Sequence, residues 1–215
     1  YKKPTVVNNV ETLAAAAGIL LNGAEKFSAI GNKKSAGTKL VCFDSFFNNP
    51  GVYEIEMGTP MKKVLNDIGG GFKEPIKALQ IGGPLGGVIP IAEAEKLNLD
   101  FQEFTAAGFM LGHASIVSIP KDFPMVEYIH HLFEFTAEES CGKCFPGRLG
   151  SYRGKEMFDQ LKSKTAKIPL KVLNDLLLTM KNGCLCALCG AIPTPIMNIL
   201  KYFGDEMKDD MVKEN

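Results

Sequence analysis

Five of the six cysteines of this 215-residue chain fall into two short groups. The first group, in the segment ESCGKCFPGRLG, contains Cys141 and Cys144 with two residues between them. The second, in the segment GCLCALCG, contains Cys184, Cys186 and Cys189. In a chain that has too few cysteines for a disulfide scaffold, such CxxC spacing favours a metal or redox site.

A set of thiolates is a soft ligand field, which suits an iron–sulfur cluster, zinc or Cu(I). Where a third cysteine would continue the spacing of the first group, the chain has Gly147, which has no side chain to bind a metal. One shared site therefore requires a fold that brings the two groups together. The sixth cysteine, Cys42, stands alone in an apolar stretch, and we expect it to be a small buried residue.

The overall composition excludes several classes of function. The chain has 24 basic and 24 acidic side chains, which gives no electrostatic argument for nucleic acid or anionic lipid as the main partner. No apolar run approaches the roughly 20 residues that span a bilayer, so we expect no direct membrane insertion. We expect a cytoplasmic protein, since the N-terminal residues do not form a secretory signal.

The sequence pattern predicts an α+β protein with three parts. Residues 1–36 contain an Ala/Leu-rich helix from about Val10 to Leu21, which Asn8 and Asn9 precede as N-cap candidates. Residues 37–120 contain two strands joined by the turn NNPG, a short helix with Thr59 as its expected N-cap, and later strands. This order is typical of a β-grasp (ubiquitin-like) domain.

Residues 121–215 contain four amphipathic segments with short connections, which predict an up-down four-helix bundle. In that topology the first and third connections lie at the same end of the bundle. Because each of these connections contains one cysteine group, we expect all five thiols at one pole. The start of the second helix, with Lys143 and Arg148 nearby, would place positive charge beside a negative cluster and raise its reduction potential. Both side chains are equally well explained as solvated surface charges.

The two cysteine segments carry a resemblance to a known family. ESCGKCFPGRLGSYRGKEM and LLLTMKNGCLCALCGAIPTPIMNILKYF resemble the end of the NADH-binding flavoprotein subunit of respiratory complex I. Related subunits occur in NAD-dependent hydrogenases, formate dehydrogenases and electron-bifurcating complexes. The middle segment, including NNPGVYEIEM and IGGPLGG, is similar to the family's soluble-ligand-binding β-grasp domain. The opening KPTVVNNVETLA resembles the end of its FMN- and NADH-binding domain.

The resemblance implies one [4Fe–4S] cluster held by four cysteines. Cys141, Cys144 and Cys186 match the ligand positions of the family, whereas the position of its third motif cysteine is occupied by Gly147. For the fourth ligand we favour Cys189, which forms a second CxxC pair with Cys186, and Cys184 stays open as the alternative. A substitute ligand at His130 is a weaker alternative.

The resemblance also implies a role in electron transfer. Electrons from NADH would pass through FMN to the cluster and then to partner Fe–S subunits, namely a [2Fe–2S] ferredoxin-like subunit and a multi-cluster subunit. Asn8, Asn9 and Thr12 would face the flavin. The family's FMN loop and NADH pocket lie upstream of these residues, so we expect a C-terminal portion of an NADH dehydrogenase subunit that does not oxidise NADH alone. The alternative function is a structural docking module with a zinc site or a lost cluster.

Overall fold

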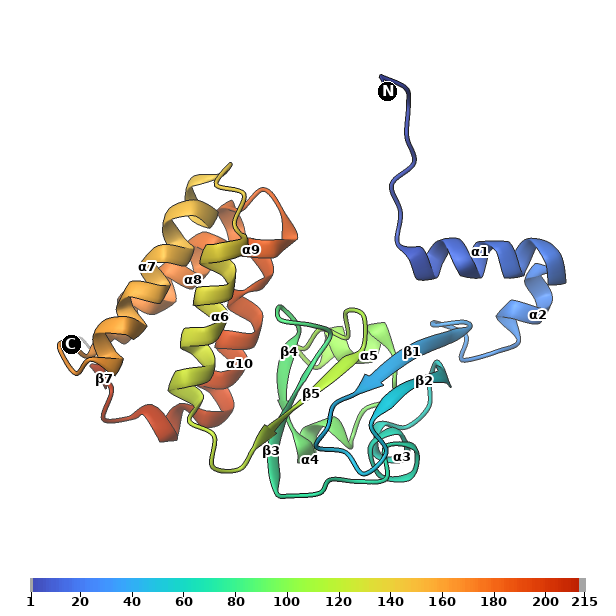
Figure 1. The fold of residues 1–215 in the computed structure, drawn as a ribbon, viewed down its shortest axis with the longest axis horizontal. Helices are drawn as coiled ribbons and strands as arrows, with labels where there is room; N and C mark the ends of the chain where they lie inside the picture. Colours follow the sequence, from blue (N-terminus) through green and yellow to red (C-terminus); the bar gives the residue numbers. More distant parts are fainter. Residues whose placement is uncertain (1, 213–215) are drawn as a thin grey trace.

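The computed structural model describes residues 2–212 of the chain. Its first part is a helical arm, in which α1 (Val10–Asn22) is followed by α2 (Ala24–Ser28). Helix α1 begins where the sequence predicts, because the side chain of Asn9 accepts hydrogen bonds from the first N–H groups of the helix. Figure 1 shows α1 standing away from the rest of the molecule, and none of its residues is buried.

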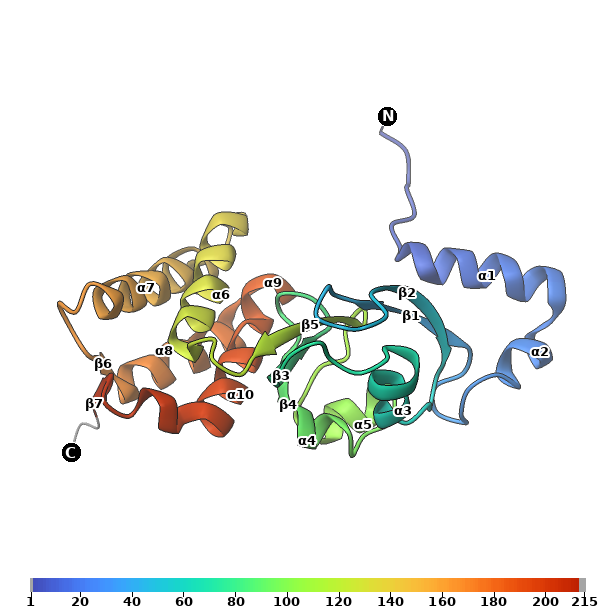
Figure 2. The same cartoon turned by 60° about the horizontal axis from the view of Figure 1, so that its bottom comes forward.

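The middle part is a five-stranded sheet with the strand order β2-β1-β5-β3-β4. Strands β1 and β5 are parallel, and the other neighbours are antiparallel. Short helical segments cover one face of this sheet and enclose a first core (Figure 2). The elements are β1 (Thr38–Phe43), β2 (Gly51–Glu56), α3 (Met61–Lys63), η1 (Val64–Ile68), β3 (Ile76–Ile81), β4 (Gly87–Pro90), α4 (Ile91–Ala94), α5 (Phe101–Ala106) and β5 (Ser115–Pro120).

Two local predictions in this part are wrong. The side chain of Cys42 is exposed, because the alternation of strand β1 directs Val41 and Phe43 into the core and Cys42 to the other face. The short helix α3 is preceded by Pro60 as its N-cap, which makes no side-chain capping bond. The hydroxyl of Thr59 instead donates to the backbone oxygen of Glu56, so it is engaged in the preceding turn.

The last part is helical and encloses a second core. Helices α6 (Met125–Glu139), α7 (Phe145–Lys162), α8 (Leu170–Gly183) and α10 (Pro193–Phe203) pack on one another, with the short α9 (Ala187–Ala191) before α10. The 3-10 turn η2 (Gly204–Met207) follows, and β7 (Met211–Val212) pairs in parallel with β6 (Ile168–Pro169). The second core is formed by fully buried side chains of these helices, including Ile129, Phe133, Phe158, Leu177 and Ile196.

Helix α7 approaches its neighbours closely because glycine recurs along its buried face. A Cβ atom added to Gly154 would lie 2.1 Å from the ring of Phe133 in α6, and one added to Gly150 would lie 2.9 Å from Met180 in α8. Glycine costs about 1 kcal/mol relative to alanine inside a helix. Here that cost accompanies the close packing of α7 against α6 and α8.

The helical part and the sheet are joined by packing and by hydrogen bonds. Ala78, Val88 and Ile119 of the sheet belong to the same core as the long helices. The hydroxyl of Tyr128 in α6 donates to Oε1 of the buried Gln80 in β3 at 2.7 Å. The protein is therefore a mixed α/β fold, in which the sheet holds the base of α6 and α10. In the part of the chain that the structure describes, we find no helix with the length and apolarity to cross a membrane.

Candidate metal centre

The two cysteine groups lie at the same end of the helical part. The first is in the connection between α6 and α7, and the second comprises Cys184 and Cys186 in the connection between α8 and α9 and Cys189 within α9 (Figure 1). A Cβ atom added to Gly183, the last residue of α8, would lie 3.0 Å from Cγ of Pro146 at the start of α7. The convergence predicted from the up-down topology is therefore confirmed.

Gly147 lies directly between thiols of the two groups. A Cβ atom at this position would lie 3.0 Å from Sγ of Cys144 and 3.0 Å from Sγ of Cys189. It would also lie 3.2 Å from Cβ of Cys189, which is a tight contact. The space beside residue 147 thus borders a sulfur atom from α9, and any side chain at this position would press on it and on the sulfur of Cys144.

Cys144 has the surroundings of a thiolate. It is the N-cap residue of α7, where backbone N–H groups are unpaired and the positive end of the helix dipole lies. Hydrogen bonds from the backbone N–H groups of Leu185 and Gly147 lower the pKa of Cys144. Because one donor lies in the first turn of α7 and the other in the connection after α8, the sulfur of Cys144 links the two halves of the site.

The remaining thiols differ in burial. Burial, together with the neighbouring Cys144, raises the pKa of Cys184 to about 12. Burial also raises the pKa of Cys189, whose side chain is almost completely enclosed. Cys141 and Cys186 are exposed at the end of the site. Within residues 2–212, no three His, Cys, Asp or Glu side chains converge on a point where they would hold a single metal ion.

The loop before Cys141 contributes a hydroxyl group that the sequence analysis missed. Ser140 is the C-cap residue of α6, and its Oγ lies 3.8 Å from Sγ of Cys189. The signal in the sequence is a serine at the end of a predicted helix, next to the first cysteine. The loop is braced by Arg148, whose Nη1 donates to the backbone oxygen of Gly142 at 3.3 Å. Arg148 is therefore more than a solvated charge.

His130, the weaker alternative ligand, is engaged elsewhere. Its Nε2 lies 2.6 Å from Oδ1 of Asp159, and its side chain is buried in the middle of α6. Asp159 lies in the C-terminal half of α7, whereas the cysteines surround the N-terminal end of that helix. This geometry does not place His130 among the thiols.

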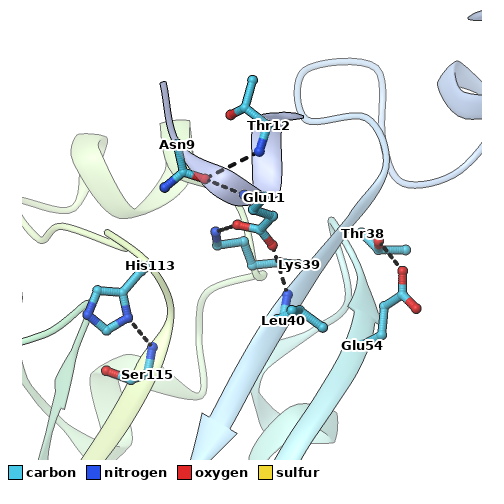
Figure 3. A network of polar contacts seen from close by, with 9 residues as sticks. All are labelled: Asn9, Glu11, Thr12, Thr38, Lys39, Leu40, Glu54, His113 and Ser115. Carbon is cyan, nitrogen blue, oxygen red and sulfur yellow. Dashed lines mark hydrogen bonds and ion pairs between the residues drawn. The ribbon is translucent and has the colours of Figure 1, made fainter. Parts of the chain in front are cut away.

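The predicted flavin-facing residues lie in the N-terminal arm and are held by local contacts. Oδ1 of Asn9 accepts hydrogen bonds from the backbone N–H groups of Glu11 at 2.9 Å and Thr12 at 3.3 Å (Figure 3). Oδ1 of Asn8 accepts from the N–H of Asn9 at 2.8 Å. These bonds are those of a helix cap, so the structure brings Asn8, Asn9 and Thr12 together at one helix end.

The same helix end is tied to the sheet through an ion pair between Glu11 and Lys39 (Figure 3). Partial burial acts to raise the pKa of Glu11, but the hydrogen bonds from Lys39 and from the N–H of Leu40 keep it below its usual value. An open cavity of about 450 Å³ adjoins this contact, lined among others by Asn9, Thr12, Lys39 and His113.

The end of the helical part that carries Cys141, Cys144, Cys184, Cys186 and Cys189, here called the cysteine pole, has the chemistry that suits an iron–sulfur cluster. Thiolate sulfur is the ligand that such clusters require, and N–H groups directed at a cysteine sulfur are a typical part of their surroundings. The chain supplies five thiols from two segments, and it supplies N–H donors to Cys144 from both segments.

Comparisons with known proteins agree with this geometry. Residues 127–210 match the family described as the NADH-ubiquinone oxidoreductase-F iron-sulfur binding region. The chain is 36% identical over 209 residues to the NADP-reducing hydrogenase subunit HndC of Solidesulfovibrio fructosivorans, covering 96% of this chain and 42% of the relative. It is 35% identical over 213 residues to a subunit of the NADH-quinone oxidoreductase of Escherichia coli (strain K12), covering 97% of this chain and 47% of the relative.

A solved structure resembles nearly the whole chain. The crystal structure of an NAD+-reducing [NiFe]-hydrogenase in the air-oxidized state matches with a TM-score of 0.86 and 27% identity. That match covers 99% of this chain and 36% of the hydrogenase chain. The chain thus spans about half or less of the relatives that it matches.

Proposed function

We propose that this chain, whose residues 127–210 match the iron–sulfur binding region of the NADH-ubiquinone oxidoreductase-F family, binds a [4Fe–4S] cluster and takes part in electron transfer. The cluster, when bound, supplies one-electron redox chemistry. Electrons would reach it from NADH through FMN held by the rest of a complete subunit, and would leave to partner Fe–S subunits. The family match and the five converging thiols support this role.

We propose Cys141, Cys144, Cys186 and Cys189 as the ligands. The observation that carries this choice is the contact between residue 147 and Cys189, whose sulfur lies 3.0 Å from the position of an added Cβ. This contact supports the replacement of the thiol missing from α7 by a thiol from α9. Cys184, the alternative, lies near Cys144 instead, whose proximity adds to burial in raising the pKa of Cys184.

The residues around these thiols have distinct tasks. The N–H groups of Leu185 and Gly147 lower the pKa of Cys144 and so favour its ionised form. The N-terminus of α7 and the charges of Lys143 and Arg148 offset the negative charge of a thiolate-bound cluster. The core beneath Cys189 keeps water from one side of the site. Together these features favour the more negative, reduced state.

The finer architecture follows from the same proposal. We infer that residues 1–36 continue an FMN- and NADH-binding domain, that 37–120 form a β-grasp domain and that 121–215 form a four-helix cluster domain. The sheet order and the packing of α6, α7, α8 and α10 support this division. Asn8, Asn9 and Thr12 would then face the flavin, beside the open cavity at the start of α1.

The partners and compartment are also part of the proposal. The named relatives are subunits of hydrogenase and NADH-quinone oxidoreductase complexes, which supports Fe–S and flavoprotein partners, among them a [2Fe–2S] subunit and a multi-cluster subunit. Free thiols persist in a reducing compartment, which favours the cytoplasm.

The direct test is the metal content of anaerobically purified protein. About four irons and four sulfides per chain, with an EPR signal after dithionite reduction, are the expected result for a [4Fe–4S] cluster. One zinc without sulfide, or no metal, would contradict the proposal and favour a structural docking module instead.

A further inference from the structure

The hydroxyl group of Ser140 lies between the two cysteine loops. Its Oγ is 3.8 Å from Sγ of Cys189 in α9 and 3.4 Å from the backbone nitrogen of Gly142. Ser140 is only partly exposed, and it ends the 15-residue helix α6, so the backbone that carries this hydroxyl is fixed by the helical core.

The direction of these hydrogen bonds follows from the groups involved. The N–H of Gly142 can only donate, so it occupies an acceptor position on Oγ of Ser140 and leaves the hydroxyl proton available. In the thiol form Cys189 can itself donate to this oxygen. Once its sulfur is ionised and metal-bound it has no proton, so the hydroxyl of Ser140 becomes the donor and the sulfur the acceptor.

The sulfur atoms of Cys144 and Cys189, which both lie beside Gly147, therefore have different kinds of hydrogen-bond donor next to them. Cys144 receives backbone N–H groups, which a substitution cannot remove without changing the chain path. The contact of Cys189 with Ser140 depends on one side chain. A hydrogen bond to a cluster sulfur stabilises the more negative, reduced state and so raises the reduction potential.

We propose that Ser140 is a positioning residue for the ligand Cys189, orienting its sulfur and raising the reduction potential of the bound cluster by one hydrogen bond. This inference rests on the proposed function, in which Cys189 replaces the thiol missing at position 147. It adds a residue outside the ligand set, from a helix that contributes no ligand of its own.

The test is an EPR-monitored redox titration of the intact chain and three variants. Ser140→Ala removes the donor, and Ser140→Thr keeps it. Ser151→Ala is the matched control, because the hydroxyl of Ser151 is buried in the same helical end but donates to the backbone oxygen of Gly147 at 2.6 Å. We expect a more negative midpoint potential in Ser140→Ala, and wild-type values in Ser140→Thr and Ser151→Ala.

Each other outcome is informative. Loss of iron from a folded Ser140→Ala chain, with rescue in Ser140→Thr, would support the same positioning role. An unchanged midpoint in Ser140→Ala, or an equal shift in Ser151→Ala, would overturn the inference while leaving the cluster in place. A wild-type chain without iron and sulfide would instead overturn the proposed function, and this inference with it.

Discussion

The cysteine pole and the N-terminal arm are the two regions to which the sequence analysis assigned cofactor contacts, and they are supported very differently. The pole lies on four long helices whose core side chains, such as Ile129, Phe133 and Phe158, are fully buried. The arm contains a well-capped helix, but α1 has no buried residue, and Leu20 and Leu21 are 87% and 85% exposed. The chain itself therefore positions the thiols, whereas it fixes α1 only at one end.

This difference teaches that residue type and spacing in the sequence predict a site reliably only where a packed core holds the site residues in place. The thiols are brought together by packing that persists whatever else is bound. The Oδ1 atoms of Asn8 and Asn9 and the backbone N–H of Thr12 are engaged in a local helix cap, which does not involve the core. We expect substitutions at the pole to have large effects on metal content and those in the arm to have small ones.

The largest effect, a loss of bound iron, is expected from single cysteine substitutions. Cys144→Ser and Cys189→Ser should each reduce iron from about four per chain to a small fraction, because each removes a thiolate ligand. Cys184→Ser and the exposed control Cys42→Ser should keep wild-type iron and sulfide. Iron and sulfide assays on anaerobically purified variants measure this. Loss of the cluster in Cys184→Ser with retention in Cys189→Ser would reverse the ligand assignment.

The helix packing that positions the cysteine pole can be weakened without substituting a cysteine. Gly154→Ala would place a Cβ atom 2.1 Å from the ring of Phe133, and such overpacking costs about 1–3 kcal/mol. Since 1 kcal/mol corresponds to about 2–4 °C in a domain of this size, the thermal midpoint should fall by several degrees.

Gly204→Ala is the matched control for this substitution. An added Cβ atom at Gly204 meets nothing within 4 Å, so the free energy of unfolding should stay within about 0.5 kcal/mol of the wild-type value. Calorimetry of both variants provides the comparison. Equal midpoints for the two variants would show that the close approach of α7 and α6 is not what holds the pole.

A pH-dependent contribution is expected from Asp159, which joins α7 to α6 through His130. The hydrogen bonds from Lys155 and His130 lower the pKa of Asp159 from its ordinary value of 3.8. A carboxyl group with a lowered pKa stabilises the folded state above the unfolded pKa, and this contribution disappears as the pH falls through the folded pKa. Wild-type stability should therefore decline below about pH 4.

Asp159→Asn should remove this part of the acid dependence, so the difference in thermal midpoint from the wild type should shrink as the pH falls from 7 to 3. Asp175→Asn, which breaks an exposed Lys171–Asp175 pair on α8, is the control and should have a smaller effect at pH 7. A difference for Asp159→Asn that stayed constant across this pH range would contradict the assignment.

The smallest effect on the whole molecule is expected in the arm. Asn9→Ala removes the cap that receives the N–H groups of Glu11 and Thr12, at a typical cost of about 1 kcal/mol to the helix. Because α1 buries no side chain, amide exchange should quicken within α1 while the thermal midpoint and iron content stay unchanged. A clear fall in either quantity would show that the arm supports the pole.

Much of this organisation could be predicted from the sequence, because the deciding signals are local. The existence of the long helices follows from their amphipathic period, and the structure places both cysteine groups at one end of the helical part. Asn9 was identifiable as a helix cap from its type and position. The resemblance to the flavoprotein subunits is confirmed by the comparisons.

The features that the sequence did not predict are the face of a strand to which a side chain points and the contacts between residues far apart in the chain. Cys42 stands among apolar residues in the sequence, which suggests burial. Pairing with the neighbouring strands sets the register of β1, and this register directs the side chain of Cys42 outward. The contact of Ser140 with Cys189 joins residues 49 positions apart, and the fit of Cys189 beside Gly147 depends on how α9 packs on α7. Neither contact has a periodic signal in the sequence.

The central claim, that Cys189 supplies the thiol missing at residue 147, is tested most directly by exchanging the two positions. The double variant Gly147→Cys with Cys189→Gly moves the thiol back to α7 and removes one of the two side chains that an added Cβ atom would meet, leaving only that of Cys144. We expect iron and sulfide near wild-type levels in the double variant and little in Cys189→Gly alone. A single variant Cys189→Gly that retains about four irons would contradict the claim.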